Sequence, residues 1–277
     1  MMRKYRTALT IAGSDSGGGA GIQADLKTFS ALGCYGMSVI TAITAQNTHE
    51  VTAVHAVPAE VITAQLDAVL ADIGTDAIKV GMLFSPEITE AVGDGLRRWG
   101  TGSIVVDPVM VSKSGDRLLT EPAVDALTEH VFPIAEVITP NLPEASALLG
   151  REVTTRGDME PAARDLLETG ARAVLLKGGH LDGDSAADVL VVRGRDGKVM
   201  SRWFEFERID TPNTHGTGCT LSSAIASFLA RGEGLEAAVE AARTYMQAAI
   251  AAGAQYELGH GHGPVHHFHA IWQETAR

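Results

Sequence analysis

The sequence lacks the features that mark disulfide-rich, secreted or membrane-spanning proteins. Its 277 residues include only two cysteines, Cys34 and Cys219, which excludes a framework of several disulfides and a CxxC zinc site. No apolar run approaches the roughly 20 residues that a membrane-spanning helix requires. The apolar stretch that follows the basic start ends at Gly13 and is too short for a signal peptide. We therefore expect a cytoplasmic protein with no membrane partner.

Basic charge is also scarce. The chain has 22 Lys and Arg against 34 Asp and Glu, a net charge of −12 when His is neutral. Nucleic-acid binding requires a basic surface, so this balance argues against a nucleic-acid partner. Hydrophobic residues make up 45% of the sequence, enough for a buried core. There is no repeat, low-complexity tract or linker, so we expect a single domain over residues 1–277.

Short β-branched runs that end in Gly, Pro or Asn alternate with stretches of helical spacing. Several runs are apolar on both faces, which is typical of strands in a covered parallel sheet. The alternation predicts a three-layer α/β/α fold with a central, mostly parallel sheet. The predicted strands are Ala8–Gly13, Val39–Ala45, Ala77–Gly81, Ile104–Asp107, Val137–Thr139 and Ala173–Leu176, followed by a hairpin of Asp188–Val192 with Val199–Phe206. The predicted helices are Gly19–Leu32, Glu60–Ile73, Glu87–Trp99, Pro122–Val131, Asp158–Thr169, about Gly218–Arg231, and Leu235–Gly253.

A glycine-rich loop, GSDSGGGAG at residues 13–21, follows the first predicted strand and precedes a helix. Such loops often bind anions because their backbone N–H groups converge. A P-loop is excluded, since Gly19 and Ala20 stand where Lys and Ser or Thr are required. The dinucleotide fingerprint fails because Ile22 stands where a third small residue is needed. Two interpretations stay open: a ligand loop, or a tight turn that needs positive φ.

The helix behind this loop carries an acidic residue close to its apolar face. Ile22, Leu26 and Phe29 mark that face, and Asp25 lies on its border. A carboxylate in such a place is costly to bury unless it has a partner. Asp25 is therefore either a hydrogen-bond acceptor for a polar ligand or a border carboxylate that turns outward.

A second glycine loop lies at residues 213–219, directly before another predicted helix. Gly216, Thr217 and Gly218 would let the backbone close on an anion at the helix N-terminus. Cys219 falls in the first turn, where the helix dipole is positive, so we expect a depressed pKa for its thiol. His215 either contacts phosphate or caps the turn.

Polar side chains follow three of the predicted strands. Asp107 precedes a proline, Asn141 and Glu144 follow Thr139, and Lys177 follows Leu176. In open α/β sheets, ligands bind beyond the carboxyl ends of the strands. Singly these residues are weak signals, since Asn141 with Glu144 could be a helix cap. Together they suit Mg²⁺ and phosphate, and so predict phosphoryl transfer without a P-loop.

These segments resemble the ribokinase-like superfamily and, within it, the hydroxymethylpyrimidine/phosphomethylpyrimidine kinases of thiamine biosynthesis. The resemblance covers essentially the whole chain, with matching blocks at residues 9–36, 40–48, 79–83, 107–116, 138–145, 175–180, 213–226 and 263–272. It implies a homodimeric, Mg²⁺-dependent enzyme that uses ATP to phosphorylate the hydroxymethyl alcohol and then its monophosphate. It also implies a central, mostly parallel sheet.

The resemblance also implies roles for individual residues. The pyrimidine site would use Gly13, Asp25, Gln46 and the backbone around Val109. Cys219 and Lys177 would be catalytic, with Lys177 and Asn141 near the phosphates of ATP and with Asp107 and Glu144 near Mg²⁺. A loop at residues 112–116 would cover the phosphates.

One position departs from the broader superfamily. Most sugar kinases of this fold carry Asp as the general base where this chain has Cys219. A cysteine there is shared with pyrimidine kinases and some pyridoxal kinases, and it either takes the proton or positions the alcohol. Two alternatives stay open: a pyridoxal or pyridoxine kinase, and an inactive vitamin- or nucleotide-binding sensor. The joint presence of Cys219, Lys177, Asp107 and Glu144 counts against the sensor.

The C-terminal tail is rich in histidine, with His260, His262, His266, His267 and His269. Gly263 and Pro264 interrupt the one pair with helical i, i+4 spacing, so a metal site is disfavoured. We expect these side chains to pack the C-terminal segment or a dimer edge.

Overall fold

The computed structural model describes residues 3–100, 102–110, 120–179, 181, 185–194 and 196–272. The strands are β1 Thr7–Asp15, β2 Tyr35–Gln46, β3 Val51–Ala56, β4 Ala77–Val80, β5 Ser103–Val106, β6 Val137–Ile138, β7 Ala173–Leu176, β8 Ser185–Arg193 and β9 Val199–Glu207. The helices are α1 Gly21–Ala31, α2 Ala59–Asp72, α3 Pro86–Trp99, α4 Glu121–His130, α5 Leu142–Leu149, α6 Arg156–Leu166, α7 Thr217–Ala230 and α8 Leu235–Gly253. Two 3₁₀ turns, η1 Phe132–Ile134 and η2 Leu167–Thr169, follow α4 and α6.

The strands form one nine-stranded sheet in the order β3-β2-β1-β4-β5-β6-β7-β8-β9. The neighbouring strands β2, β1, β4, β5, β6 and β7 pair in parallel, whereas the pairs β2/β3, β7/β8 and β8/β9 are antiparallel. The chain moves outward from β1 to β2 and then returns to β4 on the other side of β1. This reversal creates a switch point, where ligands of open α/β sheets bind.

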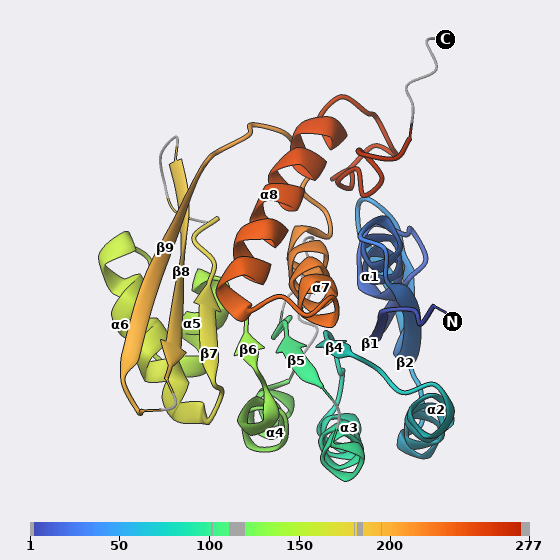
Figure 1. Cartoon of the computed structure of the whole chain (residues 1–277). Helices are drawn as coiled ribbons and strands as arrows, with labels where there is room; N and C mark the ends of the chain where they lie inside the picture. Colours follow the sequence, from blue (N-terminus) through green and yellow to red (C-terminus); the bar gives the residue numbers. More distant parts are fainter. Residues whose placement is uncertain are drawn as a thin grey trace.

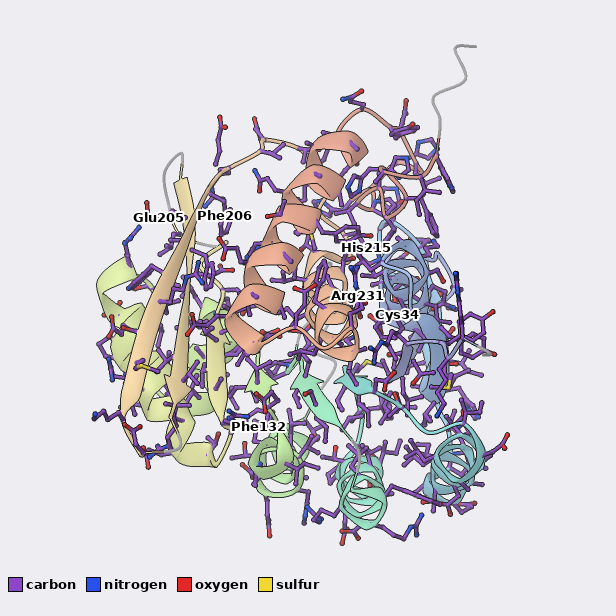
Figure 2. All side chains as sticks on the ribbon, in the orientation of Figure 1. Cys34, Phe132, Glu205, Phe206, His215 and Arg231 are labelled. Atoms are coloured by element: carbon purple, nitrogen blue, oxygen red, sulfur yellow. The ribbon has the colours of Figure 1, made fainter. Side chains whose placement is uncertain are left out.

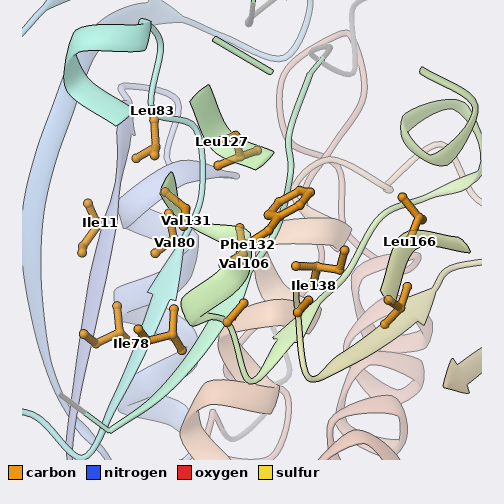
Figure 3. Packing of buried hydrophobic residues seen from close by; sticks show 14 of the residues in the cluster. Ile11, Ile78, Val80, Leu83, Val106, Leu127, Val131, Phe132, Ile138 and Leu166 are labelled. Carbon is orange, nitrogen blue, oxygen red and sulfur yellow. The ribbon is translucent and has the colours of Figure 1, made fainter. Parts of the chain in front are cut away.

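Helices cover both faces of the sheet (Figure 1). Helices α2 to α6 pack on one face in a core that includes Leu66, Leu127 and Leu166, part of which Figure 3 shows. Helices α1, α7 and α8 pack on the other face around Phe29 and Ile225. The predicted three-layer α/β/α fold with a mostly parallel sheet is therefore confirmed. Within the described ranges, no helix has the length and apolarity to cross a membrane.

The predicted elements occur with small shifts at their ends, and the structure adds two more. Strand β1 runs two residues past the predicted end at Gly13, through an irregularity between Ala12 and Ser14. Strand β3 and helix α5 were not among the predicted elements. Strand β3 escapes pattern reading because its four central residues are exposed, so no side-chain alternation marks it.

The carboxyl ends of the parallel strands gather the polar residues of the sequence motifs at one edge. Asp15 ends β1, Asp107 directly follows β5, and Lys177 directly follows β7. Asn141 and Lys177 are paired in a parallel bridge, so the ends of β6 and β7 lie side by side. The expected convergence on one edge is confirmed for Asp107, Asn141 and Lys177.

Candidate active site

The second glycine loop leads into the N-terminus of α7, which is the anion-binding geometry that its sequence predicts. Gly216 is the N-cap in a left-handed conformation, with φ +77°. A Cβ at Gly216 would also overlap the carbonyl oxygen of Gly19, so the position requires glycine twice over. The first-turn N–H groups of a helix have no intrahelical acceptor and suit an anion.

Cys219 sits in the first turn of α7 and is partly exposed. Burial raises the pKa of the Cys219 thiol to about 11. The nearby carboxylates of Asp25 and Asp107 add to this rise, and the positive charge of Lys79 opposes it without cancelling it. The backbone N–H of Gly21 also favours the thiolate. The predicted depression of this pKa is therefore wrong, because burial, together with Asp25 and Asp107, outweighs the groups that favour the thiolate.

Asp25 is fully buried and satisfied by three side chains from three different elements. Its Oδ2 accepts from Thr10 Oγ1 at 2.6 Å and from Lys79 Nζ at 2.9 Å. Its Oδ1 accepts from Ser223 Oγ at 2.7 Å. The interpretation of Asp25 as an outward-turned carboxylate is wrong, because the strands and α7 supply donors inside. A direct contact with substrate stays a prediction.

Lys79 is a buried cation that sequence reasoning did not single out. It lies on β4, and its side chain is 0% exposed. Burial pushes the pKa of Lys79 down, but the nearby acidic groups, Asp25 foremost with Cys219 and Asp107, together outweigh it and the net pKa is raised. An ammonium deep in a strand layer is costly unless it is paired. Lys79 thus places a fixed positive charge near the sulfur of Cys219.

Asp107 and Lys177, predicted from two different strand ends, form an ion pair. Lys177 Nζ lies 2.8 Å from Asp107 Oδ1, and Thr139 Oγ1 donates to the same oxygen at 3.2 Å. Burial pushes the pKa of Asp107 up, but Lys177 and Lys79 outweigh it and hold the pKa below its usual value. Burial likewise disfavours the charged Lys177, whose pKa its carboxylate neighbours nevertheless raise. Both groups are therefore charged at neutral pH.

Glu144 and Asn141 form a capping box at the start of α5. Asn141 Oδ1 accepts from the Glu144 N–H at 2.9 Å, and Glu144 Oε2 accepts from the Asn141 N–H at 2.8 Å. The helix-cap alternative is confirmed for this pair. Burial raises the pKa of Glu144 to about 7, against the opposing effect of Lys177.

The acidic groups at this edge fit a magnesium ion in number and chemistry. Asp107 and Glu144 are both buried, and each interacts electrostatically with Lys177 and with the other. Mg²⁺ usually takes one or two protein carboxylates and keeps several waters. The described part of the chain holds no cluster of three or more His, Cys, Asp or Glu that could bind a metal. That Asp107 and Glu144 hold Mg²⁺ stays a prediction.

The first glycine loop binds an anion, but that anion is the protein's own Asp15. Asp15 Oδ1 accepts from the Gly17 N–H at 2.8 Å, and Oδ2 accepts from the N–H groups of Gly19 at 3.1 Å and Ala20 at 2.8 Å. His215 Nε2 lies 2.9 Å from the same Oδ2. Two glycines of the loop have φ of +80° and +56°, which confirms the tight-turn interpretation. Sequence reasoning overlooked Asp15, and it did not foresee that His215 would bind it.

Residues 15–266 match the family model described as phosphomethylpyrimidine kinase. This chain belongs to the phosphomethylpyrimidine kinase family. It is 56% identical over 268 residues to the hydroxymethylpyrimidine/phosphomethylpyrimidine kinase of Rhizobium meliloti strain 1021, an alignment that covers 96% of this chain and 98% of that relative.

Solved structures agree with this assignment. The crystal structure of a phosphomethylpyrimidine kinase from Clostridium difficile 630 has a TM-score of 0.77 and 46% identity, covering 88% of this chain and 99% of that one. An ADP complex of Bacillus subtilis pyridoxal kinase has a TM-score of 0.88 and 40% identity, covering 98% and 100%. Both phosphomethylpyrimidine and pyridoxal kinases thus share this fold.

Of the residues expected to bind pyrimidine in this kinase family, Gly13 and Gln46 lie on the neighbouring strands β1 and β2, and Val109 follows β5. Gly13 is at the irregularity of β1, and Gln46 is the last residue of β2. The Ser16 hydroxyl donates to the Gln46 carbonyl and accepts from its N–H, both at 2.8 Å. The Val109 N–H donates to the Asp107 carbonyl at 2.8 Å. The expected phosphate-covering loop at residues 112–116 lies outside the described residues.

Part of the histidine-rich tail of this kinase packs against α7 and α8, as expected, whereas His260 and His262 are exposed. His267 Nε2 lies 3.1 Å from Thr220 Oγ1, next to Cys219, and the Tyr245 hydroxyl donates to the His267 carbonyl at 2.7 Å. The ring of His266 contacts Trp272 edge-on. Burial lowers the pKa of His267 to about 3, so its ring is neutral at pH 7. The tail therefore supports the helix that carries Cys219.

Proposed function

We propose that this protein is a bifunctional kinase of thiamine diphosphate biosynthesis. It transfers a phosphoryl group from ATP to 4-amino-5-hydroxymethyl-2-methylpyrimidine and then phosphorylates the resulting monophosphate to the diphosphate. The observation that carries this proposal is the position of the Lys177–Asp107 ion pair against the Gly216–Gly218 anion loop. A Cβ at Gly218 would lie 3.2 Å from Asp107 Oδ2 and 3.5 Å from Lys177 Nζ, so the backbone there approaches both charges closely.

The chemistry of these groups matches the needs of phosphoryl transfer. The transition state spreads charge over the phosphoryl oxygens, so catalysis depends on positioning and charge neutralisation. The N–H groups that begin α7 bind these oxygens, and Lys177 adds a positive charge. Asn141 lies beside Lys177 at the edge where the ATP phosphates bind. Asp107 and Glu144 would hold Mg²⁺, which when bound neutralises charge on the phosphate oxygens.

Cys219 contacts the acceptor as a neutral thiol in this proposal. A thiol with a pKa of about 11 is ionised in roughly one molecule in 10⁴ at pH 7. A protonated thiol cannot take the proton of an alcohol, so its contribution is to position the acceptor oxygen. The same positioning serves the alcohol and the monophosphate, because both must lie in line with the transferred group.

The pyrimidine is proposed to lie over the end of β1, near Gly13, Gln46 and Val109. An aminopyrimidine presents both donors and acceptors, and the Gln46 side-chain amide can satisfy either. Asp25 is proposed to accept a hydrogen bond from the pyrimidine, and its carboxylate is held in place by Lys79, Thr10 and Ser223. This location sets the acceptor between the first glycine loop and Cys219.

A pyridoxal kinase is the second candidate, and the likeness to the Bacillus subtilis pyridoxal kinase favours testing it. ATP consumption should be measured side by side with hydroxymethylpyrimidine, its monophosphate and pyridoxal. We expect the highest kcat/KM with the two pyrimidines. A higher value with pyridoxal would reassign the enzyme. No ATP consumption with any acceptor would favour an inactive sensor.

We further propose that the protein works as a homodimer in the cytoplasm, where ATP is available. The outer strands support association, because Ile43 on β2 and Val54 on β3 are 53% and 38% exposed. Light scattering should give a mass of about twice the 29.1 kDa of one chain. A mass of one chain at working concentration would contradict the dimer.

A further inference from the structure

Asp15 and His215 form a buried link between the two glycine loops. Their side chains are 3% and 9% exposed, and Asp15 Oδ2 lies 2.9 Å from His215 Nε2. His215 directly precedes the anion loop, and in Figure 2 it lies between α1 and α7. The two residues are 200 positions apart in sequence, so this link exists only in the folded protein.

On one side, Asp15 shapes the loop that the acceptor site requires. Its carboxylate accepts hydrogen bonds from three backbone N–H groups, those of Gly17, Gly19 and Ala20, and so closes the loop. Burial pushes the pKa of Asp15 up, but His215 and the backbone N–H groups outweigh it and lower the net pKa. Ser16, inside the same loop, fixes the backbone of Gln46. The carboxylate therefore holds the conformation of the loop on the acceptor side.

On the other side, His215 sets the position of the anion loop. The His215 N–H donates to the Gly263 carbonyl at 3.0 Å, which ties the loop to the tail. Its ring packs directly on Gly19, where a Cβ would overlap the ring. The loops touch again where Gly216 meets the Gly19 carbonyl and where the Gly21 N–H reaches the sulfur of Cys219. The two loops therefore lie in close contact next to the Asp15–His215 pair, so a shift of either loop would disturb the other.

We propose that Asp15 and His215 are positioning residues that hold the acceptor-binding loop in register with the phosphate-binding loop. The inference rests on the proposed function, because it assigns the acceptor to one loop and the transferred phosphoryl group to the other. In-line transfer requires the two to be aligned closely, and a 1 Å displacement can cost about 10²-fold in rate. Loss of the link should therefore misalign the two bound substrates and lower kcat, while the affinity for each substrate changes little.

The test compares Asp15→Asn, His215→Leu and the double variant by steady-state kinetics with both pyrimidine substrates. We expect kcat of each single variant to fall by about 10- to 100-fold. The KM for the pyrimidine acceptor and the KM for ATP should both stay within about threefold of wild type. The double variant should lose no more than the worse single variant, since the two residues form one link. His215→Gln, whose amide can reach the position of Nε2, should recover most of the activity. Asp76→Asn is the matched control, because Asp76 binds Thr7 backbone N–H at the opposite end of β1.

Three results would overturn the proposal: kcat close to that of Asp76→Asn, a rise in KM alone, or losses that multiply in the double variant. If Asp15→Asn fails to fold, the His215→Leu and His215→Gln pair gives the same decision. Failure of the proposed function is seen separately, in wild type. If the wild-type enzyme prefers pyridoxal, kcat of the Asp15 and His215 variants is compared with that of wild type using pyridoxal as the acceptor, and the same outcomes decide.

Discussion

The Asp25 carboxylate and the Lys79 ammonium lie 2.9 Å apart, and neither side chain is exposed. The pair joins α1 to β4, and hydroxyls of Thr10 on β1 and Ser223 on α7 complete the shell of Asp25. Ser223 lies one helical turn beyond Cys219, so the same face of α7 bears the sulfur and binds the buried carboxylate. The buried core next to the proposed acceptor site thus contains a paired carboxylate and ammonium.

Lys79→Met should destabilise the protein by about 3–5 kcal/mol, because it leaves the Asp25 carboxylate buried without its counter-ion. Asp25→Asn combined with Lys79→Met should recover most of this loss, since the amide keeps hydroxyl partners and needs no cation. Urea unfolding measures both. Lys198→Met, which breaks the exposed pair with Asp196, serves as the control and should leave the midpoint unchanged. A double variant as unstable as Lys79→Met would contradict the ion-pair account.

Gln46→Ala should raise KM for the pyrimidine and leave KM for ATP unchanged. The lost hydrogen bonds to the ring edge cost about 1–3 kcal/mol, or roughly 5- to 150-fold. Gln65→Ala is the matched control, because Gln65 also binds β2 but through the backbone of Ile40. Equal weakening of both substrates would assign Gln46 to the architecture of the strand end.

Glu144→Gln should lower kcat and raise the Mg²⁺ concentration required for half-maximal activity. Gln can still accept from the Asn141 N–H, so the variant removes charge but keeps the capping box. Asp158→Asn makes the same change in the capping box of α6 and should leave the Mg²⁺ dependence unaltered. Full activity of Glu144→Gln at unchanged Mg²⁺ would remove Glu144 from the metal site.

His267 should make stability fall with acidity. Its pKa is about 3 when folded and about 6.5 when unfolded, so between these values only the unfolded chain binds the proton. The free energy of unfolding then falls by about 1.4 kcal/mol per pH unit below pH 6.5, or roughly 2 kcal/mol by pH 5. In His267→Gln the drop between pH 7.5 and pH 5 should be smaller by that amount. His260→Gln, at an exposed position, should keep the wild-type drop; an unchanged drop in His267→Gln would refute the assignment.

The strand and helix order was predictable because buried strands and amphipathic helices leave clear apolar patterns. Strand β3 was not, since exposed residues such as Thr52 and Val54 form a strand through pairing with β2 alone. Helix α5 has only eight residues, and its sequence signal is the Asn141 and Glu144 cap with Gly150 at its end. Short and exposed elements depend on their neighbours more than on their own composition.

The site shows the same division. Asp107 and Lys177 were predictable because strand ends of a parallel sheet meet at one edge. Asp15 looked like an ordinary turn residue, and only its contact with His215 in the fold reveals the link. The Cys219 pKa was mispredicted because burial of the thiol, with Asp25 and Asp107 approaching from other elements, raises it. Local sequence reports the helix dipole, whereas burial and long-range charge appear only after folding.

The central claim is that both phosphoryl transfers use one shared centre at the start of α7. Its most direct test is to measure kcat/KM of the Cys219→Ala variant separately for the alcohol and for the monophosphate. An alcohol needs to lose a proton near pH 7, whereas a phosphate monoester, with a second pKa of about 6, is already largely dianionic. If Cys219 is a neutral thiol that positions the acceptor, both values should fall by a similar factor. The buried-cysteine control Cys34→Ala should change neither. A loss of about 10²–10⁴-fold confined to the alcohol would identify Cys219 as a general base and contradict this account.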